Sequence, residues 1–112
     1  MIQVYFNDEG GAFLLDVKGH GELGNIEGLD VMCAATTTLT NTLAVNVLTY
    51  EEGEMLSEKP TVYVGDDGEG RARVKCVPKP EFYPACSAGF RAVVTGYQML
   101  ATMYPDHVQF YI

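Results

Sequence analysis

The sequence contains few cysteines and none of the common metal-binding spacings, which limits its chemistry. Its 112 residues include three cysteines, an odd number placed far apart, and no tryptophan. No Cys-x-x-Cys or His-x-x-x-His motif is present, so we expect no disulfide framework, no metal site and no cofactor. Widely spaced free cysteines fit a reducing compartment, and the cytoplasm is therefore the expected location.

Basic residues are also scarce. Seven Lys and Arg stand against fifteen Asp and Glu, which gives a formal net charge of −8 and a sequence pI near 4.5. Arg71, Arg73 and Lys75 form the one basic cluster, and they alternate along a single expected strand. The average charge repels a nucleic-acid backbone and attracts a basic peptide, so we expect a protein partner and no direct contact with nucleic acid.

Long hydrophobic runs are absent as well. No stretch approaches the roughly 18–20 apolar residues that a membrane span needs, and the N-terminal residues carry no basic region or cleavage site that would predict export. Hydrophobic residues nevertheless make up 47% of the chain. This is enough for one domain, residues 1–112, with a modest core and no membrane contact.

Alternating apolar residues and turn signals predict five strands, two of the connections being Gly-rich turns. The expected strands are 1–6, 12–19, 61–64, 71–77 and 107–112. Between and after the two hairpins, the apolar period changes to that of a helix. The sequence thus predicts an α+β fold of order ββαββαβ, in which two helices pack on a mixed or antiparallel sheet to form two layers.

The two expected helices span residues 30–50 and 85–103. The first carries five threonines between Thr36 and Thr42, which intrinsic propensity disfavours, so packing against a sheet must stabilise it. In the second, Arg91 is the only charged residue between Phe82 and Pro105. We therefore expect this helix to be covered on more than one side, by the fold or by a second subunit.

His20 and Cys33 are the strongest candidates for catalysis. A Cys–His enzyme needs an ionised sulfur, an imidazole within hydrogen-bonding reach and N–H donors for the oxyanion. His20 follows an expected strand, and Cys33 lies three residues after Asp30, a good helix N-cap. A helix that begins there would direct its positive end and free N–H groups, including that of Cys33, at the sulfur. The plain alternative is a buried Cys33 and a solvated His20.

Neighbouring residues allow two interpretations each. Asp30 either caps the helix, contributing about 1 kcal/mol, or orients His20 as the third member of a triad does. Thr36 and Thr37 lie one turn beyond Cys33. Their hydroxyls either bind the sulfur or the substrate, as part of an oxyanion or substrate shell, or donate to the helix backbone.

The segment 20–29 is rich in glycine and predicts a flexible lid over a bound peptide, with Gly21, Gly24 and Gly28 as its flexible points. The spacing of Gly19, Gly21 and Gly24 also matches the dinucleotide pattern Gly-x-Gly-x-x-Gly. We do not favour dinucleotide binding, because the expected helix begins about six residues after the third glycine.

The sequence resembles the ribosomal-processing cysteine protease Prp family. The resemblance is carried by Gly19-His20-Gly21 and, after a loop, by Gly28-Leu29-Asp30-Val31-Met32-Cys33-Ala34-Ala35-Thr36-Thr37. It extends along nearly the whole chain to Tyr104-Pro105-Asp106-His107-Val108. The sequence departs from the family pattern at Gly21, where alanine is usual, and in a loop one residue longer than the common spacing.

The resemblance implies a homodimeric cytosolic thiol endopeptidase of Gram-positive and related bacteria. Such enzymes remove a short N-terminal extension from a large-subunit ribosomal protein, and some phage capsid proteins carry a similar cleavage site. His20 then matches the catalytic histidine and Cys33 the nucleophile, and the partner is a protein with a basic N-terminal extension. The alternative is a non-catalytic dimeric module that binds a ribosomal or capsid protein. A redox sensor would need Cys76 or Cys86 close to Cys33.

Overall fold

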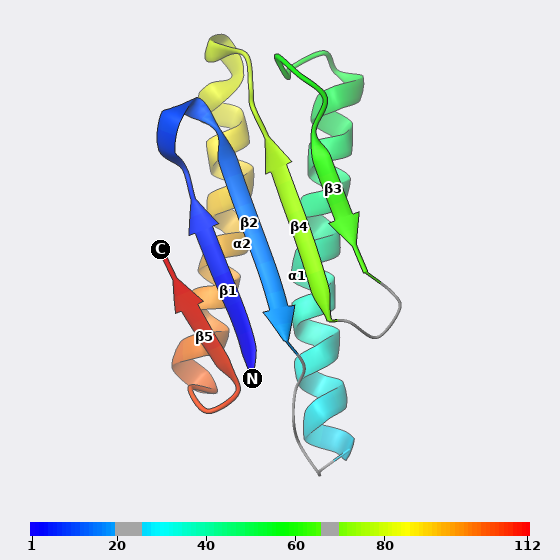
Figure 1. Ribbon diagram of the computed structural model, residues 1–112, viewed down its shortest axis with the longest axis vertical. Helices are drawn as coiled ribbons and strands as arrows, with labels where there is room; N and C mark the ends of the chain where they lie inside the picture. The colour runs from blue at the N-terminus through cyan, green and yellow to red at the C-terminus, as the bar shows by residue number, and fades with distance from the viewer. Residues whose placement is uncertain (20–25, 66–69) are drawn as a thin grey trace.

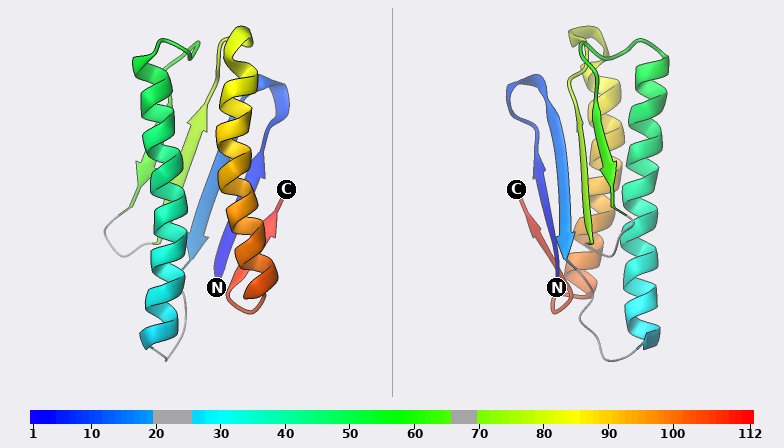
Figure 2. Two further views of the ribbon diagram at one scale, coloured as in Figure 1. Left: turned by 180° about the vertical axis from the view of Figure 1, so that it is seen from behind. Right: turned by 45° about the vertical axis from the view of Figure 1, so that its right-hand side comes forward.

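The computed structural model describes residues 1–19, 26–65 and 70–112, with the side chains of 26–31 and 33 left undescribed. The described strands form one sheet, in the order β3-β4-β2-β1-β5 (Figure 1). They are β1 (Ile2–Asn7), β2 (Phe13–Gly19), β3 (Thr61–Val64), β4 (Arg71–Cys76) and β5 (Val108–Tyr111). Helices α1 (Ile26–Glu52) and α2 (Tyr83–Met103) both cover one face of this sheet (Figure 2). The predicted two-layer α+β fold of order ββαββαβ is confirmed.

The sheet is mixed because its last strand, β5, lies parallel to β1 at one edge while the other pairs are antiparallel. β1 with β2, β2 with β4 and β3 with β4 are antiparallel, whereas β5 lies parallel to β1. Short turns, η1 (Glu9–Gly11) and η2 (Pro80–Phe82), precede β2 and α2. The chain passes from β4 through α2 to β5, and a helical crossover of this kind allows parallel strands. The other face of the sheet is not covered by either helix (Figure 2).

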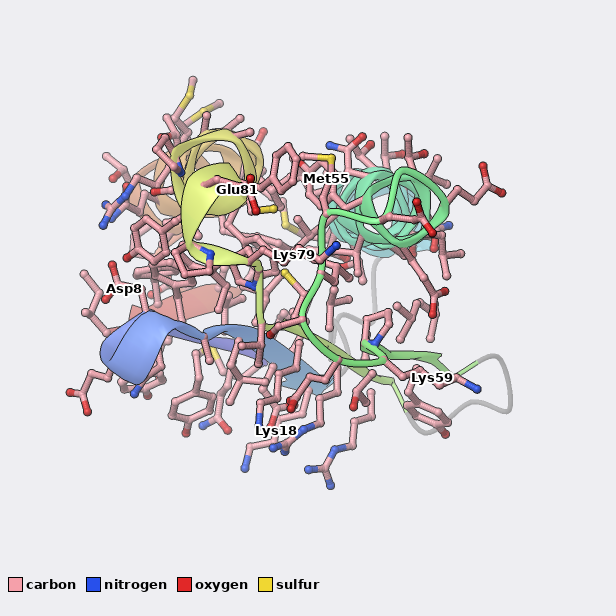
Figure 3. All side chains as sticks on the ribbon, turned by 90° about the horizontal axis from the view of Figure 1, so that it is seen from above. Asp8, Lys18, Met55, Lys59, Lys79 and Glu81 are labelled. Atoms are coloured by element: carbon pink, nitrogen blue, oxygen red, sulfur yellow. The ribbon has the colours of Figure 1, made fainter. Side chains whose placement is uncertain are left out.

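The core lies between the sheet and the helices, as the view along the layers shows (Figure 3). In β2, Phe13, Leu15 and Val17 are buried and alternate with less buried residues, as expected of a strand with one covered face. Phe13 packs on Phe90 of α2 with ring centroids 5.2 Å apart. None of the described helices is apolar over a length sufficient to cross a bilayer.

The first helix begins earlier than its sequence pattern predicts. α1 starts at Ile26, four residues before Asp30, so residues 26–29 belong to the helix and not to the glycine-rich loop. Gly28 conceals this start, because a glycine inside a helix costs about 1 kcal/mol relative to alanine. Packing compensates for the cost: Met32 is 2% exposed and anchors the early turns in the core. The expected N-cap at Asp30 is therefore wrong, since that residue lies inside the helix.

The upper halves of the two helices approach closely at Gly89. A methyl group on Gly89 of α2 would lie 2.1 Å from the Tyr50 hydroxyl oxygen of α1. Gly89→Ala should therefore destabilise the protein, because the clash exceeds the gain in helix propensity of about 1 kcal/mol. In a Tyr50→Phe background the same substitution should be neutral or stabilising, with a coupling free energy of at least about 1 kcal/mol. Urea unfolding of the four proteins in this cycle measures it, and additive effects would contradict the contact.

Candidate active site

The end of β2 holds the residue before His20 in a conformation that requires glycine. Gly19 has φ of +111°, and a Cβ there would lie 2.0 Å from the Met1 carbonyl oxygen. Its N–H donates to the Gly70 carbonyl oxygen at 2.9 Å. The end of β2 is therefore fixed, and it lies at the same end of the molecule as the start of α1 (Figure 1). His20, Gly21 and Gly24 lie outside the described residues.

Cys33 lies in the second turn of α1, not at its beginning. It is the eighth residue of a helix that starts at Ile26, about 10 Å along the axis from the first residue. In a regular helix the N–H of residue 33 is paired with the carbonyl of residue 29, and the effect of the macrodipole falls off within the first turn. Cys33 therefore lies farther from the helix start than the sequence predicts, and its role as an oxyanion donor stays a prediction.

One turn after Cys33, a buried hydroxyl joins the two helices. Tyr97 of α2 is fully buried, and its hydroxyl donates to the carbonyl oxygen of Thr36 at 2.9 Å. The hydroxyl of Thr40, which is also buried, hydrogen-bonds to the Tyr97 oxygen. Because the single Tyr97 proton is used on Thr36, Thr40 is the donor in that pair. Burial raises the pKa of Tyr97 to about 12, so it remains a donor at any physiological pH.

The two threonines that follow Cys33 occupy different environments. Thr36 is 8% exposed, and its hydroxyl donates to the Met32 carbonyl oxygen at 2.9 Å. Of the two interpretations given for the Thr36 hydroxyl, this bond is the one to the helix backbone. Thr36 is therefore part of the helix packing. Thr37 is exposed and occupies the helical position one turn after Cys33. Gly28 and Asp30 lie in the first two turns of α1, so the predicted lid includes no residue from 26 onward.

The other two cysteines are core residues at the opposite end of the sheet. Cys76 and Cys86 are free and buried, which confirms the expectation that they are structural. Cys76 pairs in register with Phe13, at the far end of β2 from Gly19. Burial raises the pKa of both thiols, that of Cys76 to about 12. Both therefore lie at the end of the sheet opposite Gly19. A resolving cysteine for Cys33 would be expected at the Gly19 end.

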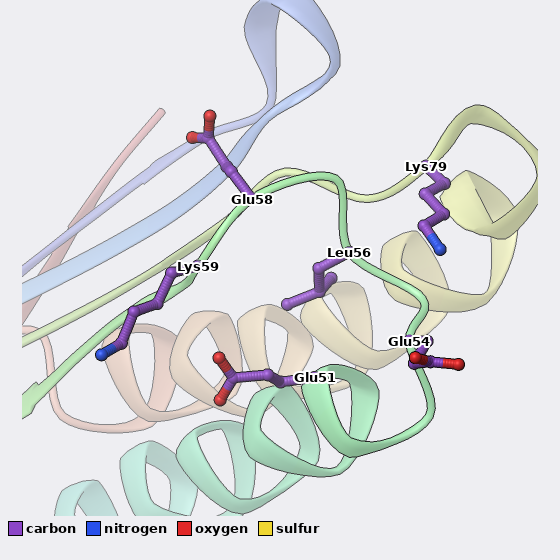
Figure 4. A pocket seen from close by; sticks show the side chains of 6 residues that line it. All are labelled: Glu51, Glu54, Leu56, Glu58, Lys59 and Lys79. Carbon is purple, nitrogen blue, oxygen red and sulfur yellow. The ribbon is translucent and has the colours of Figure 1, made fainter.

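The described residues also line one open cavity of about 440 Å³, beyond the C-terminal end of α1 (Figure 4). Its lining consists of Glu51, Glu54, Leu56, Glu58, Lys59 and Lys79. It contains no thiol or imidazole and lies at the opposite end of α1 from Cys33, so it does not contribute to the chemistry of the candidate pair. Within the described parts of the chain, no three His, Cys, Asp or Glu side chains are grouped to hold a metal ion.

Comparison with known proteins supports a thiol enzyme. The family model for the cysteine protease Prp matches residues 1–109. The fold is similar to that of SMU.848 from Streptococcus mutans, with a TM-score of 0.73 and 23% identity over 100% of this chain and 93% of that chain. A search of curated protein sequences finds no significant match.

Two structures of the ribosomal processing protease Prp from Staphylococcus aureus are also similar, each covered over 100% of both chains. The complex with a covalently linked product peptide gives a TM-score of 0.68 and 21% identity. The complex with a substrate peptide gives 0.62 and 19%. At these identities the solved structures establish the fold alone.

Removing the Tyr97 hydroxyl should loosen the helix that carries Cys33. Tyr97→Phe leaves the Thr40 hydroxyl without its buried acceptor and the Thr36 carbonyl without this donor, and we expect a loss of about 1–3 kcal/mol in the free energy of unfolding. Tyr83→Phe is the matched control, because it removes a hydroxyl from the same helix that makes no hydrogen bond to the described residues. Chemical denaturation measures both free energies of unfolding. Equal losses would show that the hydrogen bonds of the Tyr97 hydroxyl make no special contribution to stability.

Proposed function

This chain belongs to the cysteine protease Prp family, and from that membership we propose that it is a single-domain cytoplasmic endopeptidase with Cys33 as nucleophile and His20 as acid–base. Its substrate is a large-subunit ribosomal protein, or a similar phage capsid protein, from which it removes a short basic N-terminal extension. The observation that carries the proposal is the family match over residues 1–109, because it includes both His20 and Cys33.

Peptide hydrolysis by this pair proceeds in two steps. The Cys33 thiolate attacks the scissile carbonyl, and His20 gives its proton to the leaving amine; water then releases the acyl-enzyme. Because residue 33 is two turns inside α1, the thiolate depends on His20, and little on the helix dipole, for its formation.

The positions of the fixed elements support this assignment. The C-terminal end of β2 and the N-terminal end of α1 lie at one end of the molecule (Figure 1). Gly19 is held by its bond to Gly70, and α1 is held by Met32 and the Tyr97 contact. The elements on either side of residues 20–25 are therefore anchored, as a preorganised site requires.

Substitution of either catalytic residue should abolish cleavage while the fold remains intact. With the extended ribosomal protein of the source organism as substrate, intact-mass analysis should show one N-terminal truncation. Cys33→Ala and His20→Ala should each lower the rate at least about 1,000-fold. His107→Ala and Cys86→Ala are the matched controls, since they remove the only other histidine and a buried cysteine. Cleavage by Cys33→Ala would exclude the mechanism.

Thiol alkylation separates the enzyme from the alternative, a dimeric module that binds without cutting. In the native protein near pH 6, iodoacetamide should modify Cys33 rapidly and Cys76 and Cys86 only after unfolding, because burial raises the pKa of both. Fast labelling of Cys33 without cleavage would redirect the search to other substrates. Slow labelling together with no cleavage would favour the binding module.

The enzyme acts as a homodimer that associates through the side of α1 and α2 facing away from the sheet, called here the outer helix face. This face has almost no charge: no charged residue occurs between Val31 and Tyr50, and Arg91 is the only one in α2. Its exposed apolar side chains include Val45 and Met99, which are 61% and 58% exposed. An apolar surface of this kind is typical of a protein contact.

The threonines of the outer helix face make it still less polar. The hydroxyls of Thr42, Thr49, Thr95 and Thr102 each donate to the carbonyl of the residue four positions earlier, at 2.7–2.9 Å. A hydroxyl bonded to its own helix no longer requires water. The helices therefore keep a low charge and a low demand for solvent on the side that a second copy would cover.

A charge on the outer helix face should separate the dimer. Met99→Glu would bury an unpaired carboxylate in each subunit and should raise the dissociation constant of the dimer at least about 100-fold, equal to about 2.7 kcal/mol. Thr61→Glu introduces the same charge on the exposed edge of the sheet and should leave association unchanged. Sedimentation velocity at micromolar concentration measures both, and a monomeric wild-type protein would contradict the proposal.

A further inference from the structure

The face of the sheet opposite the helices gathers most of the basic residues of an acidic protein. Lys18 pairs in register with Arg71, and Arg73 and Lys75 follow along β4 at alternate positions. These four are more than half of the seven Lys and Arg of the chain. Their strand neighbours, such as Val17 and Val74, are buried against the helices, so the cations project from the other side. Figure 3 shows Lys18 on that side.

A single carboxylate from the strands lies among these cations. Asp16 accepts from Arg73 at 3.5 Å and lies 3.6 Å from Arg71, with its side chain 18% exposed. Within the described parts of the chain, Lys18 and Lys75 have no carboxylate at salt-bridge distance. The strands therefore contribute four positive charges and one negative charge to this side, although the chain as a whole carries −8.

Aromatic and amide side chains share the same side. The rings of Tyr5 and Tyr111 stack with centroids 4.8 Å apart, and the Lys18 ammonium lies 5.4 Å from the centre of the Tyr5 ring. Gln3 and Gln109 pair in register beside them. The side chains of Lys18, Arg71, Arg73, Lys75, Tyr5 and Tyr111 define what we call the basic sheet face.

We propose that the basic sheet face binds single-stranded RNA. Alternating cations on neighbouring strands attract phosphates, while tyrosine rings and glutamine amides offer stacking and hydrogen bonds to bases. An acidic peptide would be bound by the cations alone, without using the tyrosine rings or the glutamine amides. The net charge of −8 opposes this only as an average, because at about 0.1 M salt the field of distant carboxylates is screened beyond about 10 Å.

The choice of RNA over single-stranded DNA rests on the proposed function, since a protease that processes ribosomal proteins meets its substrate next to RNA. The binding measurement does not require cleavage, so its failure is distinguishable from a failure of the protease assignment. Peptide cleavage without RNA binding would leave the proposed function intact and remove this inference.

Two lysine pairs provide the test. Fluorescence anisotropy of a labelled 12-nucleotide single-stranded RNA should show saturable binding to the wild-type protein. Lys18→Gln with Lys75→Gln should weaken it at least tenfold and reduce the slope of log affinity against log salt by about 1.4, from two lost phosphate contacts. This pair leaves the Asp16–Arg bonds in place. Lys59→Gln with Lys79→Gln, both in the lining of the cavity and outside the basic sheet face, changes the net charge equally and should leave affinity within twofold.

Four results would overturn the proposal. They are no saturable RNA binding, equal weakening by the two lysine pairs, binding of a 12-residue polyglutamate peptide as tight as that of RNA, and tighter binding of the DNA of the same sequence. The third would assign the face to an acidic protein, and the fourth would replace RNA with single-stranded DNA. Circular dichroism of the three proteins excludes loss of fold as the cause of weak binding.

Discussion

The hydrogen bond from the buried Tyr97 hydroxyl to α1 is the contact on which the candidate site depends. α1 is a threonine-rich helix with a glycine in its first turn, so its own propensity does not hold it in place. Met32 binds it to the core through a buried side chain, and the Thr36 carbonyl and the Thr40 hydroxyl bind it to the Tyr97 hydroxyl of α2. The position of Cys33 follows from these neighbours, because it lies between Met32 and Thr36 on the same helix.

The two-layer fold places the buried cysteines, the uncharged helix surface and the basic residues in different parts of the molecule. Cys76 and Cys86 are buried at the end of the sheet opposite Gly19, where burial raises their pKa and keeps them protonated. The outer helix face is almost uncharged, and the basic sheet face carries most of the cations. One small domain therefore presents two faces that differ in charge, the outer helix face and the basic sheet face, and each is proposed to bind a different partner.

Much of the fold follows from short-range patterns. The hairpins, the element order and the two layers were predictable because strand alternation and helical period are local properties, and the buried residues of β2 follow that alternation. The start of α1 was not predictable, since Gly28 and Asp30 signal a loop and a cap, and the packing of Met32 outweighs both. The expected start at Asp30 placed Cys33 in the first turn of the helix, whereas Cys33 is its eighth residue.

The sequence by itself determined the family and the candidate pair, because His20 and Cys33 lie in one short motif whose residues can be read without a structure. It also predicted that Cys76 and Cys86 are core residues, Cys76 because it alternates with polar residues along a strand. Only the tertiary structure brought Tyr97 to Thr36, 61 residues away, and Lys18 to Arg71. Strand register and helix packing decide such pairs, and the free energy that selects them comes from burial over the whole chain, which no local pattern contains.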